Sequence, residues 1–419
     1  MVASEEYAYC TLITRASYLA GVILLAHSLK KHSSHPLIVL YTPSLPASSI
    51  RALELEAPKS NILLHKTEAL LPRENQHVNL IAARFADTWT KLRVFQLHEP
   101  FPQFTRLCYL DADMLIFRSP DAVFSLPLAP DWIAANHACV CNLDSDPWAP
   151  PDWTAENCAY TPLQHPSALT SPTPVTPDSR PTHHLLNSGF FLFTPSPALW
   201  SQMLHFFNTT PALTTYKFPD QDFLADFFRN RWRSVGWQYN ALKTMRYWHP
   251  DIWRDDEVVV LHYIVDKPWA KRIGPDGKAG YLGRDGETHK WWWDVWGEWK
   301  GEREGLGEEG RELVGLVREQ TDSGGMLSRD LMDIGGEVQA LAGGRKEGEK
   351  EGEKDGGKEG GKEEGLGGPH GNGHDGQNGQ TSHGHAGLPR PIEPTIRGKQ
   401  LGEKGHGPRV KGGESFMPP

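Results

Sequence analysis

The sequence predicts an α/β protein: one domain with a mostly parallel central sheet and helices on both faces, followed by a low-complexity tail. Two observations carry this prediction. Strand-like runs of β-branched and aromatic residues alternate with segments of helical periodicity between residue 7 and residue 263. Beyond Trp299, Gly, Glu, Lys and His replace apolar residues, and the overall hydrophobic content is only 38%. We therefore expect a globular domain at residues 1–300 and a disordered tail at residues 301–419, because the tail lacks the apolar surface that would offset its ordering entropy.

The first half of the expected domain alternates strands with helices. The strands are expected at residues 7–13, 37–41, 61–65 and 106–110, and the helices at residues 17–30, 48–56 and 88–97. In the first helix, apolar side chains recur at the spacing that places them on one face. The strand at 106–110 is an apolar run that stops at Asp111. Ligands of such sheets bind beyond the carboxyl ends of the strands, so a site is expected at Asp111.

The second half begins with a long segment, residues 142–181, that is dense in Pro, Ser, Thr and Trp. Loops of this length inside a compact domain are typically functional lids or partly disordered segments. After it we expect a strand at residues 188–193, helices at 197–207 and 221–228, and a last strand at 257–263. We find no internal repeat, which argues against a solenoid or propeller.

Charge and hydropathy argue against two kinds of partner. The net charge of −9, without a basic stripe in the expected domain, argues against nucleic-acid binding. The first residues lack the apolar run of a signal peptide, and the apolar stretch at residues 18–29 is too short to span a bilayer. We therefore expect no secretory signal, no membrane span and a cytoplasmic location, with which an odd number of cysteines, five, is consistent.

The first candidate site is Asp111-Ala112-Asp113. On an extended backbone, side chains two positions apart point the same way, so two carboxylates stand together at the end of a strand. Hard divalent cations prefer such oxygen ligands, and the small Ala112 leaves room for close approach. The alternative is a solvated turn, a common setting for an isolated Asp-x-Asp. The position after a buried strand favours a metal site that neutralises the diphosphate of a nucleotide-sugar.

His262 and Lys267 are the second candidate. His262 follows an apolar run at residues 258–261, and its alternative interpretation is a structural histidine. A lysine near a diphosphate, as expected for Lys267, stabilises the charge that develops on a leaving phosphate. Two carboxylates and an imidazole suit Mn²⁺ better than Mg²⁺, because imidazole is the softer ligand.

Two further motifs precede a strand and a helix. Asn187 offers a donor and an acceptor to sugar hydroxyls, and Gly189 lets the backbone come close to a ligand. Asp220 and Gln221 supply a carboxylate and an amide for recognition of a hexose. The competing interpretations are an ordinary turn for the first motif and a helix N-cap for Asp220, with Asp222 in the first turn of the helix.

Taken in order, these motifs and their neighbours resemble glycosyltransferase family 8, the glycogenin-like and galactinol-synthase-like retaining hexosyltransferases. The resemblance covers about residues 7–272, and the joint order of its short motifs is what makes it specific. The matching segments are Thr11-Leu12-Ile13-Thr14 with Tyr18, Trp89-Thr90-Lys91-Leu92, Tyr109-Leu110-Asp111-Ala112-Asp113, Asn187-Ser188-Gly189-Phe190-Phe191, Asp220-Gln221-Asp222-Phe223-Leu224, Tyr239-Asn240, and His262 with Lys267-Pro268-Trp269.

The resemblance implies a GT-A fold, a Rossmann-like nucleotide-diphospho-sugar transferase domain with a mixed central sheet. It also implies a role for each matched residue. The ligands of a Mn²⁺ ion would be Asp111, Asp113 and His262. The nucleoside would lie against Leu12, Thr14 and Tyr18. The diphosphate or donor sugar would meet Lys91 and Lys267, with Arg84 as a further donor contact. The hexose would contact Asn187, Asp220 and Gln221.

Several segments favour the galactinol-synthase branch of this family. They are the cysteine-bearing insertion with Cys139, Cys141 and Cys158, and the segments Glu74-Asn75-Gln76 and Trp248-His249-Pro250. One departure is the run from His262 to Lys267, which is shorter than the family pattern and has no Gly. A zinc site formed by Cys139, Cys141, Cys158 and a histidine is one interpretation of this group. Since Cys-x-Cys is not a usual zinc spacing, we expect the three thiols to be reduced and buried instead.

The expected activity is transfer of a hexose, glucose or galactose, from a UDP-sugar to a hydroxyl of a small polyol or saccharide, with Asp220, Gln221 and Lys267 as catalytic residues. We expect retention of configuration, because the metal-ligating carboxylates Asp111 and Asp113 are poor bases and only Asp220 is placed by motif beside the hexose.

Two other functions stay open on the sequence. One is a glycogenin-like primer that glucosylates itself, with Tyr247 as the acceptor. The other is a nucleotide-sugar-binding scaffold without turnover. The oligomeric state is also open, with a homodimer as one option. The cluster Trp291-Trp292-Trp293 either packs against the domain or forms a carbohydrate platform.

Overall fold

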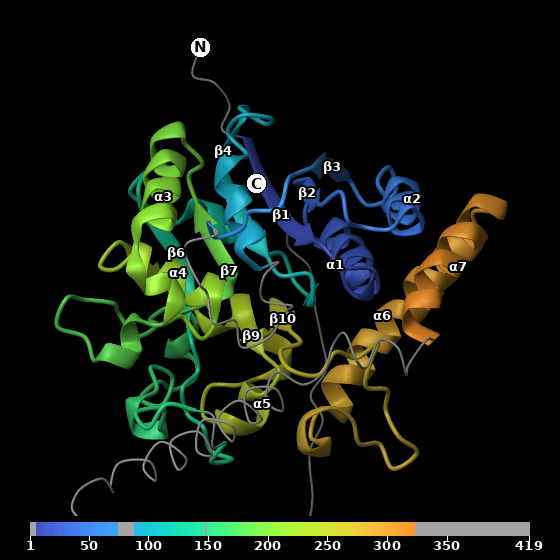
Figure 1. Ribbon diagram of the computed structural model, residues 1–419. Coiled ribbons are helices and arrows are strands. Elements are labelled where there is room, and N and C mark those ends of the chain that lie inside the picture. The colour runs from blue at the N-terminus through green and yellow to red at the C-terminus, as the bar shows by residue number, and fades with distance from the viewer. Residues whose placement is uncertain (1–5, 74–87, 147–148, 323–419) are drawn as a thin grey trace, which may run out of the picture. The chain divides into compact units, whose positions relative to one another are not determined.

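A seven-stranded sheet forms the centre of the protein. Figure 1 draws the computed structural model and labels most of these strands. The structure describes residues 6–73, 88–146 and 149–322. The strand order is β3 (Ile62–Lys66), β2 (Leu37–Tyr41), β1 (Glu6–Ile13), β4 (Phe104–Leu110), β7 (Leu186–Phe193), β6 (Ile133–His137) and β8 (Trp232–Ser234). Only β7 among these strands runs against its neighbours, and the other pairings are parallel. The expected mixed α/β sheet is therefore confirmed.

Helices pack on both faces of this sheet and bury its central strands on both sides. In β1, Ala8 and Cys10 belong to one hydrophobic core, whereas Tyr9 and Ile13 belong to the other. The Tyr9 side packs against α1 (Leu19–His32) and α2 (Ala47–Glu56). The Ala8 side packs against the 3₁₀ helix η3 (Thr88–Gln96), α3 (Pro197–Thr209) and α4 (Pro219–Phe227). This near-continuous burial is typical of strands in a parallel sheet.

A small second sheet lies beyond the carboxyl end of β4. Its order is β5 (Met114–Ile116), β10 (Val260–His262) and β9 (Ala241–Leu242), and α5 (Met245–Trp248) follows β9. In the antiparallel pairing of β10 with β5, His262 is the partner of Met114. This register brings His262 next to the residue that follows Asp113.

The segment 142–181 is loop-like, as expected. Within its described part it holds only short 3₁₀ turns, η5 (Ala155–Asn157) and η6 (Ser167–Leu169), before η7 (Pro181–His184). Further 3₁₀ turns are η1 (Ala16–Tyr18), η4 (Asp121–Ser125), η8 (Pro211–Thr214), η9 (Trp237–Asn240), η10 (Asp255–Glu257) and η11 (Tyr281–Gly283).

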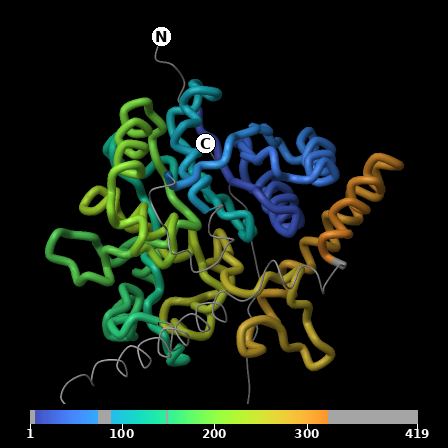
Figure 2. The backbone as a smooth tube through the Cα atoms, viewed as in Figure 1, coloured from blue at the N-terminus to red at the C-terminus, as the bar shows by residue number. Residues whose placement is uncertain are grey.

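The expected domain boundary at residue 300 falls inside a helix. The helix α6 spans Gly286–Glu304, and α7 follows at Glu308–Asp322 (Figures 1 and 2). Three apolar residues of α7 lie in the same core as α1 and α2: Leu313, Val314 and Val317. The globular part of the chain therefore continues beyond the expected boundary at least to Asp322. The composition did not indicate α7, because Glu and Gly surround the narrow apolar stripe of this helix.

The tryptophans of α6 serve packing. Trp292 is 1% exposed and stacks on Trp296 with ring centroids 5.7 Å apart and an interplanar angle of 15°. Trp291 and Trp293 are partly buried against the same core. The cluster therefore does not form an exposed carbohydrate platform.

One expected helix end differs in a way that matters for the site. Since α4 begins at Pro219, Asp220 lies in its first turn and is not the N-cap, which is Phe218. Asp222 instead accepts hydrogen bonds from the backbone N–H groups of Lys217 (2.7 Å) and Phe218 (2.9 Å). Asp220 is thereby left for other contacts. Thr88–Gln96 also forms a 3₁₀ helix where an α-helix was expected at residues 88–97.

No helix in the described part of the chain has the length and hydropathy needed to cross a membrane.

Candidate functional site

The Asp111-Ala112-Asp113 turn leaves the sheet where β4 ends. The backbone N–H of Asp111 donates to the carbonyl of Gly189 in the neighbouring β7, at 2.8 Å. The carbonyl of Ala112 lies close against α1, where a Cβ atom on Gly21 would approach it to 2.2 Å. Glycine at position 21 therefore allows the helix to pack directly beneath the turn.

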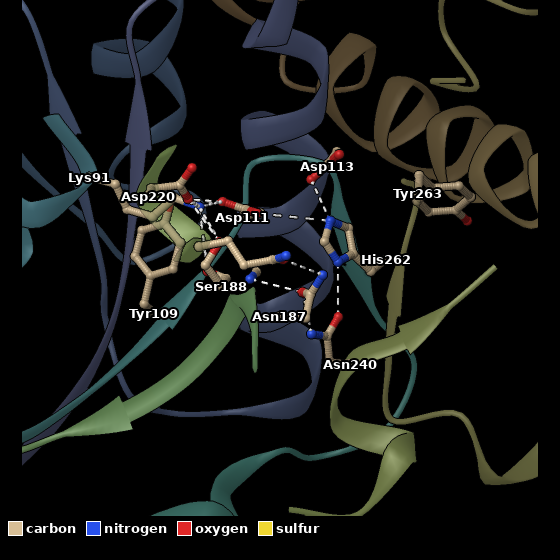
Figure 3. Close-up of polar contacts among 12 residues, drawn as sticks. Lys91, Tyr109, Asp111, Asp113, Asn187, Ser188, Asp220, Asn240, His262 and Tyr263 are labelled. Atoms are coloured by element: carbon tan, nitrogen blue, oxygen red, sulfur yellow. Dashed lines mark hydrogen bonds and ion pairs between the residues drawn. The ribbon is translucent and has the colours of Figure 1, made fainter. Parts of the chain in front are cut away.

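The imidazole of His262 faces this turn (Figure 3). Its Nε2 lies 3.3 Å from Oδ1 of Asp113 and 3.9 Å from Oδ2 of Asp111. Its Nδ1 lies 2.9 Å from Oδ1 of Asn240, and the amide nitrogen of Asn240 donates to Oδ1 of Asn187 at 2.8 Å. Since the Asn240 oxygen is thereby an acceptor, Nδ1 of His262 carries the proton.

This arrangement fits a divalent cation. With its proton on Nδ1, a neutral imidazole turns the lone pair of Nε2 toward carboxylate oxygens, which also carry only lone pairs. A cation among the three groups would satisfy all of them. The ligand atoms of Asp111, Asp113 and His262 lie within 4.8 Å of one another, and two carboxylates with one imidazole form a ligand set suited to such an ion.

Lys267 lies beside the second carboxylate. Its Nζ donates to Oδ2 of Asp113 and to the carbonyl of Tyr263, the latter at 2.9 Å. Burial alone would raise the pKa of Asp113, but the ammonium of Lys267 outweighs burial and holds this pKa well below its usual value. Asp113 is therefore ionised at neutral pH, as a metal ligand must be.

Lys91 connects the metal motif to the expected hexose site. Its Nζ lies 2.9 Å from Oδ1 of Asp111 and 2.5 Å from Oδ2 of Asp220. Burial alone would lower the pKa of Lys91, but the two carboxylates raise it above its usual value. Two more hydrogen bonds fix the group: Ser188 Oγ donates to Asp220 at 2.8 Å, and the Tyr109 hydroxyl donates to Asp111 at 2.9 Å.

The remaining motif residues meet at the ends of β7 and α4. Asn187 Nδ2 lies 3.3 Å from Oε1 of Gln221, and Asn187 Oδ1 accepts from the Gly189 N–H at 3.0 Å. Gly189 is needed here for a steric reason, because a Cβ atom would lie 2.4 Å from Cε1 of His262. Gly189 was expected to let a ligand come close to the backbone, and in the structure it leaves room for the imidazole of His262.

All the predicted site residues that the structure describes line one cavity of about 660 Å³. They are Leu12, Thr14, Tyr18, Lys91, Asp111, Ala112, Asp113, Asn187, Gly189, Asp220, Gln221, His262 and Lys267. The volume lies in the usual range for small-molecule sites. Arg84, and the segment 74–76 used for the branch assignment, lie outside the described residues. A hollow of about 740 Å³ near Pro127 and Trp232 has no carboxylate or imidazole in its lining.

Asn240, Ser188 and Tyr109 carry site contacts that the sequence did not assign to them, although all three stand inside the quoted motifs. Ser188 stands between Asn187 and Gly189, and Tyr109 stands two residues before Asp111, so their places in the motifs were a signal, whereas Asn240 stands next to no predicted site residue. Asp144 and Asp146 of the long loop also line the cavity. Asp144 pairs with Arg284 at 2.7 Å, and Asp146 accepts from the Tyr281 hydroxyl at 3.0 Å. No pattern in the sequence connects these partners.

Tyr247, the acceptor expected for self-glucosylation, lies in a different environment from the predicted site residues described above. Its hydroxyl oxygen is buried, and the guanidinium of Arg284 lies 5.2 Å from its ring centroid. Tyr247 is absent from the described residues that line the cavity.

Comparison with known proteins adds three findings. The sequence model of a family described as Glycosyl transferase family 8 matches residues 9–272, more than half of the 419-residue chain. Galactinol synthase 1 of Solanum lycopersicum is 26% identical over 71% of this chain and 84% of its own length. Galactinol synthase 4 of Arabidopsis thaliana is 28% identical over 71% and 83%, respectively. A solved structure of the glycosyltransferase GlyE from Streptococcus pneumoniae TIGR4 aligns with a TM-score of 0.44 and 16% identity, over 75% of this chain and 65% of that one.

Proposed function

The chain belongs to glycosyl transferase family 8, and from this premise we propose that it moves a hexose from a UDP-sugar to a hydroxyl of a small polyol or saccharide, with retention of configuration. The observation that carries the proposal is the convergence of three potential metal ligands, two lysines and the hexose-site residues in one cavity. That set supplies positive charge for a diphosphate next to polar groups for a sugar, which glycosyl transfer from a nucleotide-sugar requires.

The metal would be held by Asp111, Asp113 and His262. When bound, it supplies charge that neutralises the diphosphate of the donor. We propose Mn²⁺ as the ion, because the imidazole ligand favours a softer cation than Mg²⁺. Asn240 holds the His262 ring in the orientation that coordination through Nε2 needs.

Lys267 is proposed to stabilise the departing diphosphate. Its ammonium is buried, 6% exposed, between Asp113 and the Tyr18 ring, whose centroid lies 6.0 Å away. Leu12, Thr14 and Tyr18 line the same cavity and are proposed to contact the nucleoside. Arg84 remains a proposed donor contact on the basis of the family resemblance.

The proposed retention follows from how the carboxylates are occupied. Asp111 and Asp113 face the metal position, and Asp220 is bound to Lys91 and Ser188. Since each of these carboxylates is engaged by the metal position or by an ammonium ion, none of them is free to activate an acceptor from the opposite face. We propose that the departing diphosphate itself takes the acceptor proton on the same face. Asp220 and Gln221 would orient the hexose and stabilise positive charge at its anomeric carbon.

The first acceptor to test follows from the relatives. The curated relatives quoted above are named as galactinol synthases, so we propose UDP-galactose and myo-inositol as the first substrate pair. The experiment measures UDP release and product mass with Mn²⁺ for UDP-galactose and UDP-glucose against myo-inositol, glucose and glycogen. Transfer to a small acceptor supports the proposal. Donor binding without hydrolysis or transfer would identify a scaffold instead.

The buried hydroxyl of Tyr247 argues against self-glucosylation at that residue. Intact-mass measurement after incubation with UDP-glucose tests the point, and an added hexose would support the primer. NMR of any transfer product tests retention, because a β-linked product from an α-linked donor requires inversion.

A further inference from the structure

Three of the five cysteines gather around one histidine and form a group that shares no residue with the Asp111 site. Cys139 and Cys141 follow β6, Cys158 follows η5, and His249 is the C-cap of α5. His249 stands 91 residues after Cys158. Cys141, Cys158 and His249 are buried, and Cys139 is half-buried. The fold, not the sequence spacing, brings the four side chains together.

Their ligand atoms converge on one point. Nε2 of His249 lies 3.3 Å from Sγ of Cys139, 3.3 Å from Sγ of Cys141 and 3.9 Å from Sγ of Cys158. The sulfur atoms of Cys139 and Cys158 are 4.0 Å apart. All four ligand atoms lie within 4.8 Å of one another.

These separations match the edges of a tetrahedral zinc site. Zinc binds thiolate sulfur at about 2.3 Å and imidazole nitrogen at about 2.0–2.1 Å. A tetrahedron with such bonds places its sulfur atoms about 3.8 Å apart and its nitrogen about 3.6 Å from each sulfur. The observed distances between His249 and the sulfur atoms, 3.3–3.9 Å, bracket the second value.

Neither a disulfide nor a hydrogen-bonded group of thiols accounts for the cluster as well as a metal ion does. The 4.0 Å separation of Cys139 and Cys158 excludes a disulfide between them, because a disulfide bond is about 2.05 Å long. A hydrogen-bonded group of thiols leaves three sulfur atoms facing one ring nitrogen, and an imidazole N–H serves only one good acceptor at a time. Cys10 and Cys108 show how buried thiols otherwise lie in this protein, within the strands of the apolar core.

We propose that Cys139, Cys141, Cys158 and His249 bind one zinc ion in a closed, structural site. Four protein ligands complete a tetrahedral shell and leave no open position for a substrate. The Cys-x-Cys spacing argued against zinc while the histidine of the site was unidentified. The distant fourth ligand, His249, changes that conclusion.

The ion would fix one wall of the proposed active-site cavity. Cys139, Asn142, Asp144 and Trp153 all line that cavity, and they belong to the loop that the three cysteines anchor. Trp248, adjacent to His249, donates its indole N–H to Asp144 at 3.2 Å. The zinc would therefore join this loop to α5 beside the cavity without entering the chemistry.

Elemental analysis of the purified full-length protein tests the site independently of glycosyl transfer. We expect one zinc per chain in the wild-type protein, in the metal-motif variant Asp113→Ala and in the thiol control Cys10→Ala. Cys141→Ala and Cys158→Ala should lose that zinc. Wild-type protein without zinc that takes up none when it is supplied would overturn the site. Equal zinc in the Cys141→Ala and Cys10→Ala variants would do the same.

A second measurement covers the case in which the cysteine variants do not fold. Cobalt(II) is added to wild-type protein from which metal has been removed. A site with three thiolate ligands gives sulfur-to-cobalt charge-transfer absorption, which the oxygen- and nitrogen-containing Asp111 site cannot give. We expect saturation at one cobalt per chain and displacement by zinc. Absence of this absorption at saturating cobalt would contradict the proposal.

Discussion

Gly189 and His262 are matched in shape: a Cβ atom at position 189 would lie only 2.4 Å from Cε1 of the imidazole. Real Cβ atoms do not approach another carbon so closely, so any larger residue must push His262 aside. Because His262 completes the proposed metal site, this contact links the backbone of β7 to the metal.

Gly189→Ala should therefore weaken metal binding without unfolding the protein. Disturbing the orientation of a ligating histidine typically costs about 10–100-fold in metal affinity or activity. The measurement is the Mn²⁺ concentration for half-maximal UDP release, together with the melting temperature. Gly297→Ala is the matched control, because a Cβ atom there meets nothing within 4 Å. Equal Mn²⁺ dependence in the two variants would show that the contact is unimportant.

Asn240→Leu should act on the same ring from its other side. It removes the acceptor that holds Nδ1–H of His262 at 2.9 Å and so frees the ring to rotate. We expect a shift of about 10–100-fold to higher Mn²⁺ in the activity curve, with recovery of much of the rate at saturating Mn²⁺. A fall in rate that no Mn²⁺ concentration restores would point to a role in substrate binding instead.

Truncation should locate the end of the globular part after α7. A protein that ends at residue 300 loses Arg303, whose Nη2 lies 2.7 Å from Oε1 of the fully buried Glu56. Leaving that carboxylate unpaired costs about 3–5 kcal/mol, and the loss of Leu313 and Val317 from the core adds to the cost. Thermal unfolding should show a large drop for this protein, whereas one that ends at residue 322 should match the full chain. Equal melting temperatures for both truncations would restore the boundary near residue 300.

The parts of the fold that were predicted share a physical property. The strands β1, β2 and β4 are buried runs of five or more residues, and their composition alone indicates them. Asp111 was placed correctly at the carboxyl end of β4 for that reason. By contrast, β5 and β9 have three and two residues, too short for any periodic signal.

The missed parts of the site depend on tertiary contacts. The helix cap that competed with the hexose-site interpretation of Asp220 is not formed, because the start of α4 at Pro219 leaves this carboxylate to pair with Lys91. The sequence suggested the cysteine group without identifying the histidine that joins it, because His249 follows α5 and stands 108 residues after Cys141. Both relationships follow from the packing of α4 and α5 and from no local pattern.

Stability should fall in acid through His289. Burial first, and then the ammonium of Lys243 at 3.2 Å, lower the pKa of His289 to about 3. Its Nδ1 lies 2.8 Å from the Lys271 carbonyl, and Lys243 also pairs with Asp285 at 2.6 Å. The His289 imidazole binds a proton near pH 6.5 in the unfolded chain but only near pH 3 in the folded chain. The free energy of unfolding is therefore undiminished by this group above pH 6.5 and falls as the pH drops from 6.5 toward 3.

The expected contribution of His289 to the slope of the unfolding free energy against pH is about 1.4 kcal/mol per pH unit below pH 6. Urea denaturation between pH 7 and pH 4.5 measures it in the wild-type protein and in His289→Gln. The unfolding free energy of the variant should fall less steeply with decreasing pH, and the difference in slope should correspond to about one proton. Parallel curves for the two proteins would mean that His289 binds its proton equally well in the folded and unfolded chain and would contradict the lowered pKa.

Product formation by wild-type protein and by Asp113→Ala tests the central claim most directly. Both proteins are incubated with UDP-galactose, myo-inositol and Mn²⁺, and transfer is followed by mass spectrometry while the melting temperature is recorded. Asp113 follows β4 and pairs with the buried Lys267, so its loss leaves that ammonium without its carboxylate and should lower the melting temperature, whereas the apolar core that holds the fold together is unchanged. We predict transfer by the wild-type protein that requires Mn²⁺, and a loss of at least about 100-fold in the variant, because a charged metal ligand is gone. Undiminished transfer by folded Asp113→Ala would contradict the proposed metal site and the mechanism that depends on it.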